Sequence, residues 1–502
     1  MVVGVALLAG VRRPSHDELP HPARWALGGR GLGTTATCLL LGGTVYTSYT
    51  YIAVPGLIFG TGGLALYALV YTMMLSPLIM IMLPRLRDVA ARHGLVTVAD
   101  YVRARHDSHP LALATALTGI LATMPYLGLQ VVGLTAVLQA MGLTPTGVAG
   151  CAVLTLLFLL FALFTHPGGL RACARVSFAK AGLIGTAVIV LLALVLHRLG
   201  PPGEVFTLAA LRSKATGQPF GVPMQGFSAY ATLAVGSALA QLMYPQVLVV
   251  AMASRSKHTL RAATTYLPAW SMTLGLWAFL GVAALAAGVQ TQAGHGELAV
   301  PTLIGQLAPD WLAGLLFGAI AVAGLLPAVL MAMSMAMLFV RNVYVEYLNP
   351  TATPKHEVRA ARGPVLVIMA GAVAFALLMK PQDAVNLHLL GGVWILQLLP
   401  AVALSLFTRF FHRRALFLGW ATGMVAGTAL LGLGRFSSVV DVGIGSLHAP
   451  VYVAVTALAL NLAVAAVLTP VLEALKVPRG TDVTADGAAW ERRGSKYAFV
   501  VE

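Results

Sequence analysis

The stretch TTATCLLLGGTVYTSYTYIAVPGLIF, residues 34–59, decides the fold. It is apolar enough to enter a membrane, and its 26 residues would extend roughly 39 Å as a helix, beyond a hydrocarbon core of about 30 Å. Its middle is unsuited to a plain span, because Gly42 and Gly43 are followed by closely spaced Thr, Ser and Tyr residues and then by Pro55. Non-helical backbone survives at membrane depth only where it is buried in protein or lines a wet cavity. The stretch therefore predicts a broken helix that forms half of a solute site.

The composition is that of a polytopic membrane protein. Of the 502 residues, 58% are hydrophobic and only 10% are charged, whereas a soluble domain carries about 25% charged residues. The three cysteines show no metal spacing and indicate neither a disulfide framework nor a redox motif. Residues 2–11 are apolar but too short to cross a membrane. We expect them to be the remainder of a truncated first helix, with a frayed interfacial start as the alternative.

The hydrophobic segments predict twelve full transmembrane helices in an all-α protein. Their approximate ranges are 34–59, 62–83, 112–138, 146–165, 178–197, 227–252, 264–288, 312–340, 364–379, 386–407, 415–434 and 450–473.

Lys and Arg give the orientation. They concentrate in alternate connecting segments, beginning with residues 12–33 and ending with 476–502. By the positive-inside rule these segments are cytoplasmic, which predicts a multi-pass plasma (inner) membrane protein with a cytoplasmic C-terminus. The net charge of +15 is then explained by the basic residues of the cytoplasmic segments, which set the topology and contact acidic lipid headgroups. Nucleic acid is not expected as a partner.

Three connecting segments carry expectations of their own. Residues 85–106 alternate apolar and basic positions, which suits an amphipathic helix on the inner membrane surface, with a solvated connector as the alternative. Residues 198–226 are rich in Pro and Gly and are expected to be an extracellular loop. The last residues, 476–502, are polar and are expected to form a disordered cytoplasmic tail.

A second interrupted segment indicates an internal repeat. The sixth span, SAYATLAVGSALAQLMYPQVLVV at residues 228–250, has small residues at Gly236 and Ser237, where we expect a break, then polar Gln241 and Tyr244 before Pro245. Spans one and six would start on opposite sides of the membrane, as an inverted repeat requires. The predicted organisation is a start at 1–33, a first five-helix repeat at 34–197, a loop at 198–226, a second repeat at 227–407, two peripheral helices at 408–475 and a tail at 476–502.

Several motifs resemble the sodium/solute symporter family. They are WALGGRGLG at 25–33, GGTVYTSYTYIAVPG at 42–56, GLVTVADYVRAR at 94–105, GGLRA at 168–172 and LLGGVWILQLLPA at 389–401. The last of these, with RNVYVEY at 341–347 and LMYPQ in span six, is most similar to the branch that carries small monocarboxylates. The resemblance implies the five-plus-five inverted repeat of the leucine transporter, extra C-terminal helices and alternating access around a midplane site.

The resemblance also implies where a sodium ion would bind. The backbone carbonyls of Gly43 and Tyr46 in span one would face Ala323, Leu326 and Pro327 in span eight. In better-known members the last two positions are serines that supply oxygen ligands. Since neither Leu nor Pro offers a side-chain oxygen, sodium coupling is put in doubt.

Lys180, near the start of span five, offers another cation. A lysine within a membrane helix is costly and is by default a functional hypothesis. One alternative is that it snorkels to the inner headgroups. The other is that its ammonium occupies the cation site, as similar proton-coupled carriers of amino acids do. Burial favours the neutral amine, so such a lysine could load and release protons.

The substrate contacts expected at the two breaks are polar side chains. His388 in span ten invites a proton relay, but its place near the outer end of that span predicts an interface residue. The candidates for substrate binding are Thr44, Thr47, Thr50, Gln241 and Tyr244.

Together these patterns predict a secondary active transporter for a short-chain monocarboxylate such as pyruvate, lactate, acetate or propionate, coupled to sodium or protons. Pantothenate, proline or a sugar remain alternative substrates, and an ion channel is an alternative class. No enzyme motif such as HExxH or GxSxG, and no pair of intramembrane carboxylates, is present in the sequence. No cofactor is expected beyond a bound sodium ion.

Overall fold

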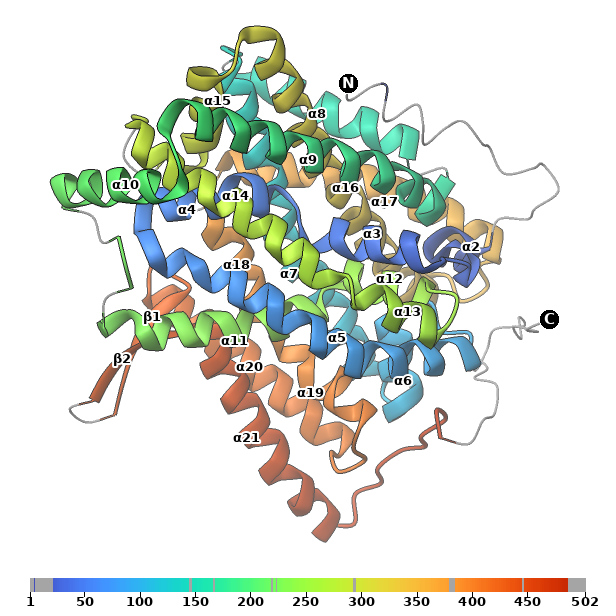
Figure 1. Cartoon of the computed structure of the whole chain (residues 1–502). Coiled ribbons are helices and arrows are strands. Elements are labelled where there is room, and N and C mark those ends of the chain that lie inside the picture. Colours follow the sequence, from blue (N-terminus) through green and yellow to red (C-terminus); the bar gives the residue numbers. More distant parts are fainter. Residues whose placement is uncertain are drawn as a thin grey trace.

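The computed structural model describes Gly4 and residues 21–485, and within that range it is almost entirely helical (Figure 1). The predictions for residues 2–11 and for the end of the tail at 486–502 lie outside the described residues, Gly4 apart. The other residues that the structure leaves undescribed are 144–146, 166–167, 218–219, 223, 292–294, 379–383 and 445–446.

The first predicted span is a broken helix. Helix α3 (Thr34–Val45) ends at Tyr46, whose backbone is extended, and the chain resumes as the π-helix η2 (Tyr49–Ala53) and helix α4 (Val54–Thr61). The break therefore follows the two glycines instead of falling on them. A helical glycine costs only about 1 kcal/mol relative to Ala, so Gly42 can remain within α3. The Trp270 ring packs directly against it, where a side chain would clash.

The sixth span is also broken, but not where the small residues predict. Helix α11 (Phe227–Met243) runs without interruption through Gly236 and Ser237, so the expected break there is wrong. The bend of 54° lies at Tyr244, before helix α12 (Pro245–Ala253). A residue before proline is driven out of the helical region, and Tyr244 is extended at φ −63° and ψ 134°.

The remaining long helices coincide with the other predicted spans. By length and composition, eight helices of the described part could cross a membrane, or nine with the bent α11–α12 pair; the count of twelve stays a prediction. The long helices are α5 (Tyr67–Arg92), α7 (His109–Ala140), α8 (Gly147–Thr165), α9 (Gly169–Leu199), α14 (Leu267–Ala287), α16 (Asp310–Phe339), α17 (Pro354–Leu378), α18 (Ala384–Ile395), α20 (Arg413–Leu433) and α21 (Val453–Ala474).

Helix α16 lies at the centre of the bundle. It packs against α7, α9 and α17, and almost its whole length is buried. Helix α7 also packs against α18, and α3 packs against α9. Helices α20 and α21 pack mainly on each other, at one edge of the molecule in Figure 1. This arrangement brings the break of the first span between α7, α9 and α16.

Short elements complete the chain. They are α2 (Pro22–Leu27), η1 (Gly28–Arg30), η3 (Gly62–Leu66), α13 (Lys257–Thr264), η6 (Gly296–Leu298), α15 (Ala299–Leu307), η7 (Val340–Leu348), α19 (Leu399–Val402), and the one-turn helices η5 (Met224–Gly226), η9 (Leu396–Leu398) and η10 (Leu404–Leu406).

Three connecting segments differ from their predictions. Residues 198–226 contain helix α10 (Pro202–Thr216), which begins with a proline and ends at left-handed Gly217, both ordinary helix-end signals. Residues 85–92 continue helix α5, and a separate helix α6 (Val98–His106), capped by Thr97 and Asp100, is largely buried in protein, so residues 85–106 do not form one exposed amphipathic helix. An antiparallel hairpin of β1 (Val439–Ile444) and β2 (Leu447–Tyr452), which the sequence did not suggest, precedes α21.

The first residues of the C-terminal tail are held against the helices. The Asp482 carboxylate accepts a 2.5 Å hydrogen bond from Arg105, and the Val483 backbone N–H donates to the carbonyl of Ala104. The expectation of a wholly disordered tail is therefore wrong for residues 476–485.

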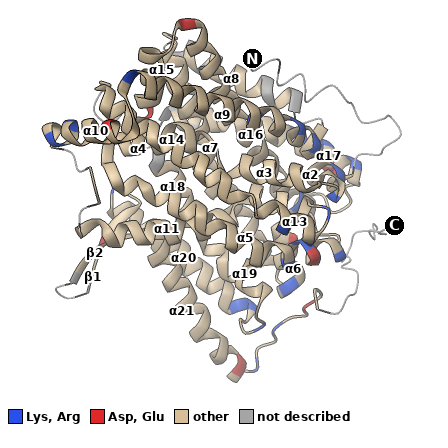
Figure 2. Ribbon diagram, in the orientation of Figure 1, with Lys and Arg blue, Asp and Glu red and all other residues tan. Residues whose placement is uncertain are grey.

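Charged residues are concentrated at one end of the bundle. Figure 2 shows Lys and Arg gathered around α2, α6, α13 and α17, with a smaller group at the tip of α10. This asymmetry agrees with the charge pattern of the connecting segments and leaves the middle of the bundle almost free of charge.

Candidate functional site

The break in the first span exposes the carbonyl end of a helix inside the protein. The last carbonyls of any helix lack intrahelical partners, and the C-terminal end carries partial negative charge. Helix α3 ends at Val45 between neighbouring helices, so these carbonyls cannot reach bulk water. Other groups must satisfy them, and two helices supply those groups from opposite sides.

Helix α9 supplies Lys180 on one side of the break. The Lys180 Nζ donates hydrogen bonds of 3.1 Å to the carbonyl of Gly43 and 2.7 Å to that of Tyr46. The side chain is only 1% exposed, so it does not snorkel to a headgroup surface. The Tyr51 hydroxyl donates to the same Tyr46 carbonyl at 3.2 Å. These are the two carbonyls that the resemblance implies for a sodium ion.

Helix α7 supplies Tyr126 and Gln130 on the other side. The Tyr126 hydroxyl lies 3.4 Å from the carbonyl of Val45 and accepts from the Thr47 hydroxyl at 3.5 Å. The Gln130 side chain donates to the Thr47 hydroxyl at 3.3 Å and accepts from the backbone N–H of Ser48 at 3.0 Å. Side chains from α7 and α9 thus hold several of the backbone groups that the break leaves without helical partners, as a break at membrane depth requires.

Helix α16 closes the third side of the break with apolar groups. A Cβ built on Gly43 would lie 4.0 Å from the Leu326 side chain, and one on Gly324 would meet the Ser48 hydroxyl at 2.5 Å. Ala323, Leu326 and Pro327 are buried, and none carries a side-chain oxygen. The carbonyls of Gly43 and Tyr46 already have the Lys180 Nζ as partner. The residues present therefore do not fit a sodium ion here, since sodium needs several oxygen ligands.

A ring of aromatic side chains surrounds His388 of α18. The ring centroids of Tyr126, Tyr49, Tyr244 and Tyr71 lie 4.5, 4.8, 5.9 and 6.4 Å from that of the imidazole. We call this group the His388 cage. The histidine is 2% exposed, so its expected position at a membrane interface is wrong. The cage joins spans one, two, three, six and ten.

The predicted substrate residues divide into three groups. Thr47 and Tyr244 lie in this region with partners: Thr47 bonds Tyr126 and Gln130, and the Tyr244 hydroxyl donates to the His388 carbonyl at 3.3 Å. Thr44 donates to the carbonyl of Leu41 in its own helix. The Thr50 hydroxyl and both amide atoms of Gln241 are buried and make no hydrogen bond within the described part of the chain.

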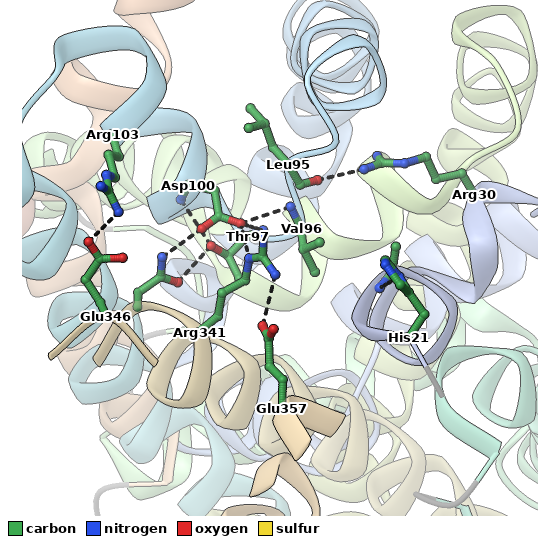
Figure 3. A network of polar contacts seen from close by, with 12 residues as sticks. His21, Arg30, Leu95, Val96, Thr97, Asp100, Arg103, Arg341, Glu346 and Glu357 are labelled. Atoms are coloured by element: carbon green, nitrogen blue, oxygen red, sulfur yellow. Dashed lines mark hydrogen bonds and ion pairs between the residues drawn. The ribbon is translucent and has the colours of Figure 1, made fainter. Parts of the chain in front are cut away.

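A second buried polar cluster lies at the basic end of the bundle (Figure 3). Arg341 donates to Asp100 at 2.6 Å and to Glu357 at 2.9 Å. Asp100 also accepts from Asn342 at 2.9 Å and from the backbone N–H groups of Val96 and Thr97 at 3.0 and 3.2 Å. We call this group the Asp100 cluster. It ties α6, η7 and α17 together.

Sequence reasoning missed most of the cage. Tyr49, Tyr71 and Tyr126 stand in long apolar segments, where an aromatic residue indicates packing as readily as binding. One pattern in the sequence could have indicated Tyr126. It follows Pro125 and stands four residues before Gln130, so its hydroxyl and the Gln130 amide lie on one face of a membrane helix. No group of His, Cys, Asp and Glu side chains that could hold a metal occurs among the described residues.

The fold and the site define a class of protein: a helical membrane carrier with two interrupted spans around a buried polar centre. The comparisons specify it further. The model of the sodium:solute symporter family matches residues 25–427, so the chain belongs to that family. The chain is 40% identical to a "Monocarboxylate transport permease protein" of Rhizobium johnstonii, over 92% of this chain and 93% of that protein. It is 28% identical to the uncharacterized symporter YodF of Bacillus subtilis, over 84% of each chain.

Solved structures show the same fold. A Na⁺-coupled sialic acid symporter in a substrate-bound, outward-open state superposes with a TM-score of 0.71 at 16% identity, covering 94% of this chain and 96% of that one. MHP1, a nucleobase-cation-symport-1 family transporter in a closed conformation, gives 0.51 at 13% identity, covering 94% and 98%. The predicted leucine-transporter fold is confirmed, and the chain is a multi-pass membrane transporter and not an enzyme.

Proposed function

We propose that this transporter carries a short-chain monocarboxylate by alternating access, with the Lys180 ammonium in place of a sodium ion. The observation that carries the proposal is the pair of hydrogen bonds from Lys180 Nζ to the carbonyls of Gly43 and Tyr46. The relative named as a monocarboxylate permease supports the substrate class. The apolar residues Leu326 and Pro327, where sodium-binding relatives are expected to have serines, support the absence of sodium coupling.

Charge balance favours a carboxylate as the substrate. A buried ammonium is stable only with compensating groups, and two neutral carbonyls plus a helix C-terminus compensate it in part. A substrate anion bound near the break would complete that compensation. A protonated lysine would hold the break rigid and attract the acid, whereas its neutral amine would keep two N–H donors but no charge. Its weaker hydrogen bonds to the two carbonyls would loosen the break. Proton release from Lys180 would thereby couple substrate movement to the proton gradient.

The test is uptake into proteoliposomes. Labelled pyruvate, acetate and propionate are offered while the sodium and proton gradients are varied separately. We expect saturable uptake without sodium, driven by inward proton flow. Lys180→Met should lower uptake roughly a hundredfold, because two charged hydrogen bonds worth about 3 kcal/mol are lost. Lys257→Met is the matched control, since Lys257 is about half exposed on α13 and pairs with the partly exposed carboxylate of Asp88.

Two results would contradict the proposal. Uptake that disappears when sodium is removed would place a sodium ion in the mechanism and leave Lys180 as a structural residue. Uptake of proline, a sugar or pantothenate in preference to all three monocarboxylates would give the protein another substrate within its family.

The proposed orientation follows from the charges. With the basic end of the bundle at the cytoplasmic face, residues 12–33 and the C-terminal tail are cytoplasmic, and the Arg and Lys side chains contact acidic headgroups. A protease added outside intact cells should leave a C-terminal epitope tag intact, whereas cleavage of the tag would reverse the orientation.

A further inference from the structure

One arginine at the start of the first span has an incomplete set of partners. The Nη2 group of Arg30, in η1, donates to the carbonyl of Leu95 at 2.9 Å, whereas its Nη1 group is buried and has no hydrogen-bond partner in the part of the chain that the structure describes. Figure 3 shows this side chain beside the Asp100 cluster, in which Arg341 bonds two carboxylates. Buried polar groups are nearly always paired, and a buried cation needs a partner most of all. The unpaired Nη1 group therefore indicates a ligand.

The backbone holds Arg30 in an unfavourable conformation. Its φ of 55° lies in the left-handed region, which a residue with a long side chain rarely adopts. It follows Gly28 and Gly29, which are also left-handed, and Arg171 of α9 donates from Nε to the Gly28 carbonyl at 3.0 Å. Such strain persists only where the surrounding structure fixes it, and it is frequent at functional sites. The GGR turn therefore fixes where the guanidinium lies.

The charges around Arg30 favour an anion as its missing partner. Burial lowers the pKa of Arg30 to about 10, with further lowering by the charges of Arg87 and Arg341 and an opposite contribution from Asp100. The guanidinium is still protonated at neutral pH. Asp100 already accepts hydrogen bonds from Arg341, Asn342 and two backbone N–H groups. An added anion would offset both the burial of the Arg30 charge and its repulsion by the other arginines.

The inner halves of the two interrupted spans meet beside this arginine. Helices α3 and α12 pack together, and the Leu32 backbone N–H donates to the Ala253 carbonyl at 3.3 Å, while the Arg255 N–H donates to the Leu32 carbonyl at 2.9 Å. Arg30 stands two residues before this bridge, and the Arg87 side chain donates to the carbonyl of Arg255. A solute that leaves the two breaks toward the basic end passes between α3 and α12, so it emerges next to both arginines.

We propose that Arg30, with Arg87 near it, forms an anion subsite at the inner mouth of the transport path, which receives the carboxylate of the acid as it leaves the protein; this rests on the proposed function. A guanidinium presents N–H groups in a planar fork that matches a carboxylate, and hydrogen bonds between ions are about twice as strong as neutral ones. Parting of the bridge would release Arg87 from the Arg255 carbonyl and make it a second donor. The Nη1 group of Arg30 is buried in protein, so a lipid headgroup does not reach it.

The experiment compares the two faces of the membrane. Exchange of labelled propionate is measured in everted and in right-side-out vesicles, which gives one half-saturation concentration for the cytoplasmic face and one for the outer face. Arg30→Gln should raise the cytoplasmic value at least about fivefold, because a hydrogen bond between ions is lost, and leave the outer value within about twofold. Arg30→Lys keeps the charge and should raise it less. Arg92→Gln, which removes an exposed charge at the end of α5, is the matched control.

A charge-rescue measurement separates binding from a structural role. Arg30→Cys should regain cytoplasmic affinity when an aminoethyl methanethiosulfonate attaches a positive charge. The sulfonatoethyl reagent, which attaches a negative charge, should not restore it. Native protein treated with each reagent controls for modification of the other cysteines.

The outcomes separate this inference from the proposed function. If native protein exchanges propionate but Arg30→Gln changes both faces equally, or lowers only the maximal rate, Arg30 is a structural clamp on Leu95 and the inference is overturned while the proposed function stands. Equal rescue by both reagents has the same meaning. If native protein exchanges no monocarboxylate, both proposals fail. Thermal unfolding in detergent identifies a variant that does not fold; Arg30→Lys then decides, and an unchanged cytoplasmic half-saturation concentration overturns the inference.

Discussion

The Asp100 cluster and the His388 cage are both buried and polar, yet they are completed in opposite ways. In the Asp100 cluster the guanidinium of Arg341 has two carboxylate partners, and Asp100 accepts from side chains and backbone together. In the cage, His388 Nδ1 and the Tyr71 hydroxyl have no hydrogen-bond partner among the residues that the structure describes. A saturated network fixes the connection between elements, whereas an unsaturated one indicates that a ligand completes it.

The largest effect expected from this comparison is on stability. Asp100→Ala removes the main partner of a fully buried arginine, which should lower the free energy of unfolding by about 3–5 kcal/mol. Thermal unfolding of the purified protein in detergent measures the change. Asp88→Ala is the control: this carboxylate is 30% exposed and pairs with Arg87 and Lys257 at the surface, so its loss should cost at most about 1 kcal/mol.

A double variant sharpens the same comparison. Replacing Arg341 by Met together with Asp100→Ala removes the uncompensated charge, and we expect it to recover part of the lost stability. Equal melting temperatures for Asp100→Ala and Asp88→Ala would show that the Asp100 cluster does not stabilise the fold more than a surface ion pair does. The distinction from the His388 cage would then have no basis.

A structural feature of this protein could be predicted only where it requires a recognisable pattern of residues in the sequence. Hydropathy located the long helices because each must satisfy its backbone within an apolar layer. Lys180 was identifiable because a lysine in an apolar segment is rare and costly. The small residues Gly236 and Ser237 predict a break in span six, yet α11 continues through both. A glycine stands at 236 because the Tyr452 ring packs where a Cβ would lie.

The cage lay beyond the reach of local patterns. His388 meets Tyr49, Tyr71 and Tyr126 only through the packing of four helices, and nothing within its own segment, NLHLLGG, marks it as buried and central. Helix α10, in contrast, has ordinary helix-end signals in Pro202 and Gly217. They were hard to recognise because the whole segment 198–226 is rich in Pro and Gly. Tertiary contacts that depend on several helices leave no periodicity along the chain.

A smaller effect should appear as a pH dependence at the basic end of the bundle. Burial lowers the pKa of His106 in α6 to about 4, and its Nε2 contacts the carbonyl of Ala401 at 3.2 Å. The folded state therefore favours the neutral ring, while the unfolded state binds a proton near pH 6.5. Stability should fall as the pH drops from about 6.5 to 4, by up to about 3 kcal/mol.

The measurement is the melting temperature across that pH range, in native protein and in His106→Gln. The glutamine keeps an amide donor for Ala401 but binds no proton, so its melting curve should be flatter below pH 6.5. Parallel curves for the two proteins would mean that His106 does not contribute to the loss of stability at low pH. Other titrating groups would then cause that loss.

The smallest effect tests the packing that sets up the break itself, where two adjacent glycines differ in their surroundings. A Cβ on Gly42 would lie 2.5 Å from the Trp270 ring, whereas one on Gly43 would meet nothing closer than Leu326 at 4.0 Å. Gly42→Ala should therefore displace the indole, which stacks on Tyr46, and cost about 1–3 kcal/mol. Gly43→Ala should be neutral or slightly stabilising, since alanine suits a helix better than glycine.

Uptake distinguishes the consequence of that displacement. Trp270 holds the Tyr46 ring, and the Tyr46 carbonyl is one of the two that Lys180 contacts, so Gly42→Ala should reduce transport even in the fraction of protein that remains folded. Gly43→Ala leaves that ring in place and should retain uptake. If both variants lose stability and uptake alike, the pair of glycines acts as a simple flexible joint. The close approach of Trp270 would then not be what positions the carbonyls for the ammonium.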